Sequence, residues 1–534
     1  MFASSALQDG NAAMQRQAFS RIIGGGAFAA LVLVGMTSLL TVGTTSPANA
    51  LPSFARQTGQ PCGTCHTDFP ALTPYGRRFK LLGYTPGGGQ FRTTPFSSNA
   101  GIAARAEYEK MVGYVKALPP QAAKSDEEKE WVPPISFMAV VGYTHTQAPL
   151  STLTAASPDP YSDNNNVVLS PFSAFWGGAI TDHVGAFAQV TYNAIGPGPS
   201  ADPFDRHTWT WDNTDVRYAN TASVGPFDFI YGITANNNPT VQDVWNTTPA
   251  WSFPYAVSNI YGPQGAGTAI EGAFAAHVGG VGAYTMINDL LYLELTGYKT
   301  LGFSAQNSLG TDPFSAPGQL GAVTPYWRVA LEPHWGRNTL MVGAFGGQFN
   351  VHPWVDTSFA TWSTAVFPQT DRFTDIGFDT QYQYQADNWW LTLRGSYIRE
   401  YQRLDATFTN GLGPNGQTNA NDQLNSLKLQ ASFAYGADNR VVFTGQYFNQ
   451  WGTADAGLYG TDPATGLALT PNTNGWTAEI AYIPFGASKM VGWPWFNARI
   501  GLQYTYYNKL NVNFANTPNP HDNNTLFLHA WFAM

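Results

Sequence analysis

Apolar and polar side chains alternate along most of this chain, from about residue 134 to its end. The alternation runs through segments of about 10 to 14 residues, such as "DIGFDTQYQYQ" at 375–385. In that segment Ile376 and Phe378 fall on one face, and Asp375 and Asp379 fall on the other. Successive side chains of a β-strand point to opposite sides of the sheet. The pattern therefore predicts strands that form a wall with apolar surroundings on one side and polar surroundings on the other.

Other segments repeat this arrangement, and they keep their charges on the polar face. The segments at 389–397, 427–433 and 496–503 each contain one basic residue, and in each it falls opposite the apolar side chains. A charge that faces lipid near the bilayer midplane costs about 2–4 kcal/mol, so this placement fits a membrane wall. The last ten residues, "TLFLHAWFAM", also alternate. They resemble the C-terminal signal of outer-membrane proteins, with methionine in place of the usual final aromatic residue.

The connections between these strands alternate between tight turns and long polar loops. Turn signals appear at 181–183, 223–226, 333–338, 386–388 and 436–439, and long loops rich in Asn, Asp, Gly, Pro, Ser and Thr separate them. Counting both kinds predicts about sixteen strands, an even number, which is typical of a bacterial outer-membrane β-barrel with short periplasmic turns and long outer loops. A secreted β-sandwich or β-helix is the alternative, but neither fold needs this strict alternation of connections.

Composition agrees with a membrane barrel and argues against one class of partner. Only 11% of the 534 residues are charged, whereas soluble proteins carry about a quarter. The chain holds 26 tyrosines, 17 tryptophans and 54 glycines, which suit strands, turns and membrane interfaces. Its net charge of -9 argues against a nucleic-acid partner.

The first fifty residues predict an exported protein. Arg16 and Arg21 precede the apolar run "IIGGGAFAALVLVGMTSLL", and small residues at 48–50 fit a signal-peptidase site, with mature protein starting near Leu51. Retention of this run as an anchor helix is the alternative. We therefore predict four parts: a signal peptide (1–50), a cytochrome segment (51–90) ending in "TPGGG", a connector (91–133) and the barrel (134–534).

Both cysteines of the chain lie in "CGTCH", the attachment pattern of a c-type haem. In that chemistry Cys62 and Cys65 form thioethers with the porphyrin, and His66 is an axial ligand of the haem iron. The alternatives are a thioredoxin-like redox pair, half of a zinc site and a disulfide. A zinc site lacks a second Cys or His pair nearby, and a disulfide across two residues closes too small a loop to stabilise much. The sequence therefore predicts one covalently attached haem c.

The sequence does not determine which group occupies the sixth coordination position of the haem iron. Between His66 and residue 90 there is no methionine or histidine, so a second protein ligand has to come from further along. The nearest candidates are Met111, Met138 and His145, and an open position is the alternative. Methionine and histidine set different redox potentials.

The segment "PSFARQTGQPCGTCHTDFPALTPYGRRFKLLGYT" at 52–85 resembles the fused outer-membrane monohaem cytochrome-porin family of iron-oxidising bacteria. The similarity is dense in this segment and weaker over the barrel, where it rests on the architecture and on "VVGYTHT" at 140–146. Tyr75 stands where phenylalanine is expected in the family signature. The resemblance implies a haem-bearing plug, held in or at the mouth of the barrel, that passes electrons from an extracellular donor to periplasmic carriers.

From these observations we expect an electron-transfer protein that takes electrons from extracellular ferrous iron and passes them to a periplasmic cytochrome or other carrier. As an enzyme it would be a ferrous iron oxidase. A conduit with a different donor or acceptor, and a diffusion porin whose haem is structural or sensory, remain alternatives. No loop shows a defined iron-ligand spacing, and aspartates such as Asp159, Asp163 and Asp202 are expected to be ordinary solvated side chains.

Overall fold

The computed structural model describes residues 52–58, 60–85, 133–153, 163–192, 209–311, 313, 317–353, 368–436, 439–462, 464–486, 493–510 and 519–534. The predicted signal peptide and nearly all of the predicted connector lie outside these residues. So do Met111, Asp159 and Asp202. The parts of the cytochrome segment and of the barrel that are described belong to one compact unit.

One antiparallel sheet of 18 strands dominates the described residues, and two of its strands, β10 (Gln319–Leu320) and β12 (His334–Trp335), are only two residues long. Subtracting them leaves 16 long strands, as the alternation of turns and loops predicted. The long strands are β3 (Ile135–Thr146), β4 (Asn165–Ala179), β5 (Val184–Tyr192), β6 (Trp209–Val224), β7 (Phe227–Asn236), β8 (Val278–Ile287), β9 (Leu291–Thr300), β11 (Thr324–Leu331), β13 (Asn338–His352), β14 (Asp371–Gln385), β15 (Trp389–Arg403), β16 (Asn421–Tyr435), β17 (Val441–Gly452), β18 (Thr473–Tyr482), β19 (Asn497–Leu510) and β20 (Thr525–Ala533).

The sheet closes on itself because its first and last long strands pair. Each long strand is hydrogen-bonded to the next along the chain, and β20 pairs with β3 from Thr525 opposite Thr146 to Ala533 opposite Met138. Between β9 and β13 the strand β11 completes the circuit. Closure satisfies the backbone groups that an open sheet would leave at its edges.

The two faces of the wall differ as the sequence predicted. On β14 the outward Phe378 is 57% exposed, whereas the neighbouring Asp379 is 4% exposed and faces the lumen. Arg394 and Gln430 are likewise buried on the lumen side of β15 and β16. Large apolar side chains form the outward surface, among them Val281, Leu295, Val329, Leu393, Leu429, Phe443, Ile480 and Leu502. A closed barrel with an apolar outer belt is the form in which strands cross the bacterial outer membrane, and this chain is located there.

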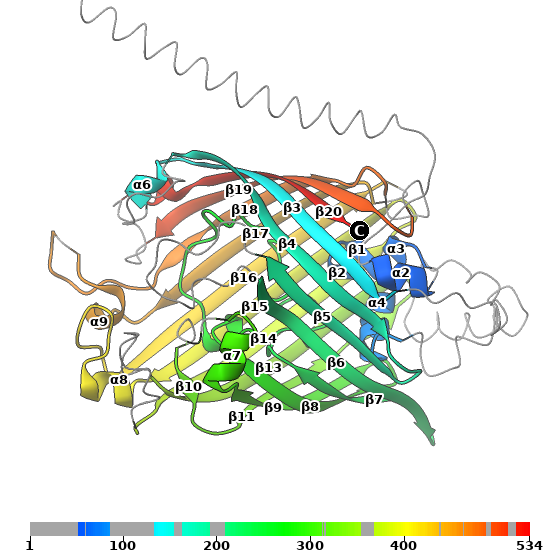
Figure 1. Cartoon of the computed structure of the whole chain (residues 1–534), viewed down its shortest axis with the longest axis horizontal. Coiled ribbons are helices and arrows are strands. Elements are labelled where there is room, and N and C mark those ends of the chain that lie inside the picture. Colours follow the sequence, from blue (N-terminus) through cyan, green and yellow to red (C-terminus); the bar gives the residue numbers. More distant parts are fainter. Residues whose placement is uncertain are drawn as a thin grey trace, which may run out of the picture. The chain divides into compact units, whose positions relative to one another are not determined.

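The two ends of the barrel carry different connections (Figure 1). Short turns such as 180–183 and 386–388 lie at one end, which we call the turn end, and connections such as 404–420 and 453–472 lie at the other, the loop end. By the rule for such barrels the turn end faces the periplasm. The loop-end connections contain α6 (Leu150–Leu153), α7 (Phe303–Ser308), α8 (Asp405–Asn410), α9 (Ala456–Tyr459), η2 (Ala269–Glu271) and η4 (Pro520–Asn523).

Two inserts lie in the lumen. The first, which we call the plug, is residues 52–58 and 60–85, and its elements are α2 (Pro52–Thr58), α3 (Cys62–Cys65), β1 (His66–Asp68), β2 (Ala71–Leu72) and α4 (Pro74–Leu81). It lies at the turn end (Figure 1). The second is the lumen loop, residues 237–277, which joins β7 to β8 at the loop end and folds inward. Among the described residues no helix is long and apolar enough to span a bilayer.

Candidate functional site

The two cysteines and His66 lie on a single short turn at the turn end of the barrel. Cys62 and Cys65 begin and end the helix α3, and His66 follows as the first residue of β1. The Thr64 N–H donates to the Pro61 carbonyl at 3.0 Å and closes the turn. Cys62 and Cys65 form no disulfide with each other. The close spacing that covalent haem attachment requires is therefore present in the fold.

The helix α4 holds this turn in place by direct backbone contacts. The Thr73 side chain caps α4 by accepting from the Gly76 N–H at 3.1 Å, and it donates to the Thr64 carbonyl at 2.6 Å. The Thr73 N–H donates to the Cys65 carbonyl at 2.9 Å. A Cβ atom on Gly76 would lie 2.2 Å from the Cys65 carbonyl oxygen, so only glycine permits this close approach. "CGTCH" and "LTPYG" thus form one packed unit.

His66 is oriented and uncharged in a way that suits an iron ligand. Its Nδ1 lies 3.2 Å from the Pro70 carbonyl oxygen. Because that oxygen can only accept, Nδ1 carries the proton and Nε2 keeps its lone pair. Removal from bulk water lowers the pKa of His66 to about 4, although hydrogen bonds to the backbone at Pro70 and Ala71 oppose the shift. The imidazole is therefore neutral near pH 7, as metal ligation requires.

The chemistry of Cys65 argues against a reactive thiol pair in this fold. Burial, followed by the neighbouring Cys62, raises the pKa of the Cys65 thiol to about 12. Thioredoxin-like pairs work because a nucleophilic cysteine has a lowered pKa. A thiol that stays protonated at neutral pH has the opposite property, which argues against Cys65 as a redox nucleophile.

A cavity of about 380 Å³ opens directly beside Cys62, Cys65 and His66. Its wall is mainly apolar and draws on the plug, the barrel strands β3, β4, β5 and β20, and the lumen loop. The aromatic side chains in this wall are Phe54, Phe69, Phe79, Phe137, Phe175, Phe187, Trp251, Trp531 and the rings of Tyr84 and Tyr255.

The lining fits a haem bound through the two sulfurs. A porphyrin needs a large apolar cover on both sides, and the plug alone, at about 35 residues, is too small to supply it. The barrel wall and the lumen loop complete the enclosure. In addition, Trp531 has a buried indole N–H with no acceptor among the described residues, which is a donor available to a polar edge of a bound group. Cys62 and Cys65 would hold the ring and His66 would supply one axial nitrogen.

Ion pairs between buried side chains fix the plug against the barrel wall. Arg77 Nη2 lies 2.5 Å from Glu332 Oε1 at the end of β11. Arg78 pairs with Asp289 in the turn between β8 and β9, and Asp68 pairs with Arg499 of β19. Each partner comes from a different part of the wall. The plug therefore has one defined orientation, and the position of His66 follows from it.

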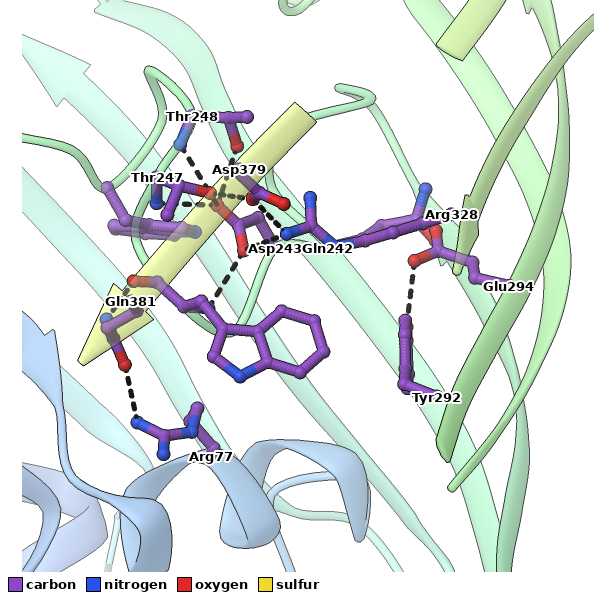
Figure 2. Close-up of polar contacts among 12 residues, drawn as sticks. Arg77, Gln242, Asp243, Thr247, Thr248, Tyr292, Glu294, Arg328, Asp379 and Gln381 are labelled. Carbon is purple, nitrogen blue, oxygen red and sulfur yellow. Dashed lines mark hydrogen bonds and ion pairs between the residues drawn. The ribbon is translucent and has the colours of Figure 1, made fainter. Parts of the chain in front are cut away.

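Hydrogen bonds to uncharged side chains supplement these pairs on the side of the plug that faces the lumen loop. Figure 2 shows Arg77 reaching from the plug to Gln381, whose Oε1 lies 2.9 Å from Arg77 Nη1. The Gln383 oxygen accepts from the same nitrogen at 2.8 Å. The Leu72 N–H donates to Asn246 of the lumen loop at 3.0 Å. The plug, the barrel wall and the lumen loop thus share one layer of polar contacts on the lumen-loop side of the haem motif.

The lumen loop forms the part of the cavity wall that faces the loop end. It starts and ends at the loop end, yet its middle contacts the plug, so residues 246–259 lie between the cavity and the outer loops. Inside it, Asp243 accepts from the backbone N–H groups of Trp245 and Thr247, both at 2.8 Å. Figure 2 shows Asp243 and Asp379 pointing toward Arg328 of β11, with which both form ion pairs.

The three candidates for the sixth haem ligand differ in where they lie relative to the cavity. Met138 of β3 lines the cavity. His145, on the same strand, lies on the opposite face, where its Nδ1 is 2.9 Å from the Asn165 side-chain oxygen. Met111 lies outside the described residues. Of the loop aspartates, Asp163 is exposed, and the described part of the chain holds no group of three or more His, Cys, Asp or Glu side chains arranged to bind a metal ion.

Several residues that shape this site were not identified from the sequence. Trp251 and Tyr255 belong to a segment that reads as an ordinary outer loop, and nothing in its composition shows that it folds inward. Arg77 and Asp68 could have been suspected from the sequence, because charged residues are scarce in this chain and a charge in a small plug needs a partner. No feature of the sequence points to their partners, which are up to 431 residues away.

Comparison with protein-family models gave no match, and comparison with curated proteins gave none either. Among solved structures, the chain is similar to Salmonella typhi OmpF in complex with daunomycin, with a TM-score of 0.39 and 12% identity over 75% of this chain and 97% of that one. It is also similar to the outer membrane channel DcaP of Acinetobacter baumannii (TM-score 0.38, 11% identity, 75% and 96%) and to OmpT of Vibrio cholerae (0.37, 10%, 75% and 96%). Similarities this distant carry no argument about function, and the barrel described above rests on its own strand pairing.

Proposed function

We propose that this chain is an outer-membrane cytochrome-porin that takes electrons from extracellular ferrous iron through one covalently bound haem c and passes them to a periplasmic cytochrome or other carrier. The observation that carries the proposal is the apolar cavity beside Cys62, Cys65 and His66 at the turn end of a closed barrel. A one-electron cofactor and a structure that crosses the outer membrane are then combined in one chain.

Each part of the site has a task in this function. Cys62 and Cys65 attach the ring, and the neutral His66, held by the Pro70 carbonyl, binds the iron. When bound, the haem supplies reversible one-electron chemistry. The aromatic lining excludes water from the ring, and burial of this kind is one of the levers by which a protein sets a haem potential.

The location of the cavity defines the direction of transfer that we propose. The turn end faces the periplasm, so a soluble periplasmic carrier reaches the plug from that side. The donor acts from the loop end, with the lumen loop between it and the cavity. For a ferrous donor there is a further reason to keep the reaction outside, because the ferric product precipitates at neutral pH and oxidation at the surface keeps it out of the cell.

A diffusion porin with a structural or sensory haem is the alternative. The contents of the lumen argue against it, since the plug and the lumen loop both lie inside the barrel and are tied to its wall by buried ion pairs. A conduit that uses a different extracellular donor shares every structural feature with the iron oxidase. The kinetics of haem reduction by ferrous iron distinguish this conduit from the iron oxidase.

The test mixes purified, oxidised full-length protein with ferrous iron in a stopped-flow spectrometer, across acid to neutral pH. We expect the sharpened visible bands of reduced c-type haem. The Cys62→Ala, Cys65→Ala double variant should show no haem stain on a denaturing gel, and His66→Ala should lose the normal reduced spectrum. Retained stain in the double variant would overturn the haem assignment.

Two further results would separate the alternatives. If iron leaves the haem oxidised at every pH while a strong artificial reductant reduces it, the iron oxidase is excluded and the conduit with another donor stands. Solute flux through the barrel in liposomes, at a rate like that of an open porin, would support the diffusion porin instead.

A further inference from the structure

The cavity wall contains few side chains of the kinds that bind haem iron. Besides His66 and the two cysteines of the attachment motif, these are Met138, Lys80, Tyr84 and Tyr255. The polar atoms of the last three are engaged elsewhere in the structure. These four residues are therefore the candidates for a second axial ligand in the cavity wall.

The amine and phenol groups are committed to other partners. Lys80 Nζ donates to the Val241 carbonyl and, at 3.2 Å, to the Asp243 carbonyl. The Tyr84 hydroxyl donates to Asp215 at 2.7 Å. Ligation by either residue would break these buried hydrogen bonds and leave their acceptors without a donor, which is unfavourable for buried groups.

Tyr255 is held in a similar way. Its hydroxyl oxygen accepts from Arg394 at 3.1 Å and from Gln430 at 3.2 Å, and both of these donors come from the barrel wall. Burial, the largest effect, raises the pKa of Tyr255, although Arg394, Gln430 and Arg499 act in the opposite direction. A tyrosine binds haem iron as a phenolate, so this residue is a poor ligand here.

Met138 has the opposite character. It lies on the lumen face of β3, opposite Ala533 of β20 and Ser173 of β4. Its side chain packs against the buried cluster of Val140, Ala256, Phe527 and Trp531. It also packs against the buried cluster of Tyr84, Phe175 and Phe187. Met138 therefore lies in the part of the cavity wall where these two clusters meet.

The other two candidates from the sequence do not share this position. His145 is seven residues from Met138 on the same strand, an odd number, so it points to the other face of the wall. At about 3.3 Å per residue it is also about 23 Å further toward the loop end. Met111 lies outside the described residues and serves below as a control.

We infer that Met138 is the second axial ligand of the haem iron, opposite His66. The inference rests on the proposed function, because it presupposes a haem on Cys62 and Cys65. A thioether is a soft ligand whose sulfur keeps its lone pairs at every pH, so a dry aromatic wall suits it. Methionine opposite histidine gives a higher potential than two histidines, which fits an acceptor for electrons from iron.

The inference also explains why the plug can be so short. A small soluble cytochrome must carry its own second ligand, whereas here the barrel wall would supply it. Docking of the plug would then complete the iron coordination, and haem ligation and barrel assembly would be coupled.

The test compares the full-length protein with Met138→Leu and Met138→His, and uses Met111→Leu and His145→Gln as matched controls. Each variant is purified with haem, and its covalent attachment is checked by haem stain after denaturation. Barrel folding is checked by the faster migration of unheated sample on a gel. The readouts are the ferric absorption spectrum, including the weak far-red band of a methionine-ligated haem, and the midpoint potential from a redox titration.

We expect the parent protein and both controls to show the far-red band. Met138→Leu should lose it, acquire a high-spin ferric spectrum, and keep both the haem stain and the folded barrel. Met138→His should remain low-spin without the far-red band, and its midpoint potential should fall below that of the parent protein.

The outcomes that overturn the inference differ from those that overturn the proposed function. A parent protein with covalent haem but no far-red band, or a Met111→Leu variant that loses the band while Met138→Leu keeps it, excludes Met138 as the ligand. In contrast, a parent protein without any haem stain would exclude the proposed function itself. If Met138→Leu does not fold, the spectrum and potential of Met138→His decide.

Discussion

The plug and the lumen loop both fill the same lumen, but they are attached to its wall by different chemistry. The plug uses charged side chains of its own, among them Arg77, Arg78 and Asp68, which pair with charges on the wall. The lumen loop has two ion pairs of its own, Asp243 with Arg328 and Glu271 with Lys428, and in addition it offers backbone carbonyl groups. Wall glutamines and arginines donate to these carbonyls, as Gln446 does to Phe253 at 2.9 Å and Gln503 does to Ala256 at 3.1 Å.

The difference follows from how each insert is connected to the barrel. The lumen loop is anchored at both ends to neighbouring strands, and neutral hydrogen bonds supplement its two ion pairs with the wall. The plug is joined to the barrel through one end, by the segment that leads to β3. Ion pairs with partners on β11, β19 and the turn between β8 and β9 give it a defined place, because a buried charge tolerates only the position that pairs it. Specificity matters more for the insert that carries the haem motif.

Loss of the charge that pairs with Asp68 should have the largest effect. Arg499 pairs with both Asp68 of the plug and Glu479 of β18. In Arg499→Met the buried Asp68 would lose its ion-pair partner and Glu479 would keep only its contacts with His529 and Gln503, and breaking a buried pair in this way costs about 3–5 kcal/mol. We expect a barrel that unfolds at lower guanidinium concentration in lipid bilayers, measured by tryptophan fluorescence, and less covalent haem.

Arg372→Met is the matched control for this variant. Arg372 lies on a wall strand with an exposed side chain that donates to Asn350, and its loss should change stability by less than about 0.5 kcal/mol. Equal midpoints for Arg499→Met and Arg372→Met would show that the ion pair does not fix the plug.

A pH effect at Lys80, which joins the plug to the lumen loop, should be the next largest. Burial, with a contribution from Arg217, lowers the pKa of Lys80 from 10.5 to about 7, while Asp215, Asp243 and Glu294 oppose the shift. Between pH 7 and 10.5 the unfolded chain therefore binds one more proton than the folded protein. Folding stability should rise with pH in that window, by at most about 1.4 kcal/mol per pH unit.

Lys80→Met removes this titration and provides the comparison. Unfolding midpoints are measured at pH 7 and pH 9 for the parent protein and the variant. We expect the parent protein to gain more stability than Lys80→Met over this interval. A parent protein whose midpoint changes with pH no more than that of the variant would show that Lys80 stays charged in the fold.

The smallest effect should come from a neutral contact of the lumen loop. In Gln446→Leu the Phe253 carbonyl loses its wall donor, which costs about 1–2 kcal/mol for a buried acceptor. We expect a modest fall in the guanidinium midpoint and unchanged covalent haem. A loss as large as that of Arg499→Met would mean that the two inserts depend on the wall in the same way.

The local pattern of the sequence was sufficient for the wall and for the haem motif. Strand alternation has a period of two, so the sequence alone predicts that Phe378 and Asp379 lie on opposite faces of the sheet. The number of strands followed from turns and loops that can be read in order along the chain. "CGTCH" likewise needs only five consecutive positions, because both sulfurs and the imidazole must lie on one turn to meet one ring.

Everything that depends on closure of the barrel was decided by the tertiary structure. The inward course of the lumen loop, the pairing of Arg77 with Glu332, and the placement of Met138 in the cavity beside His66 all depend on which residues face the same lumen. Glu332 is 255 residues from Arg77, and no local pattern links them. A charged or thioether side chain becomes part of a site only when closure of the barrel places its strand next to the plug. For Met138, the register of β3 against β20 fixes this position.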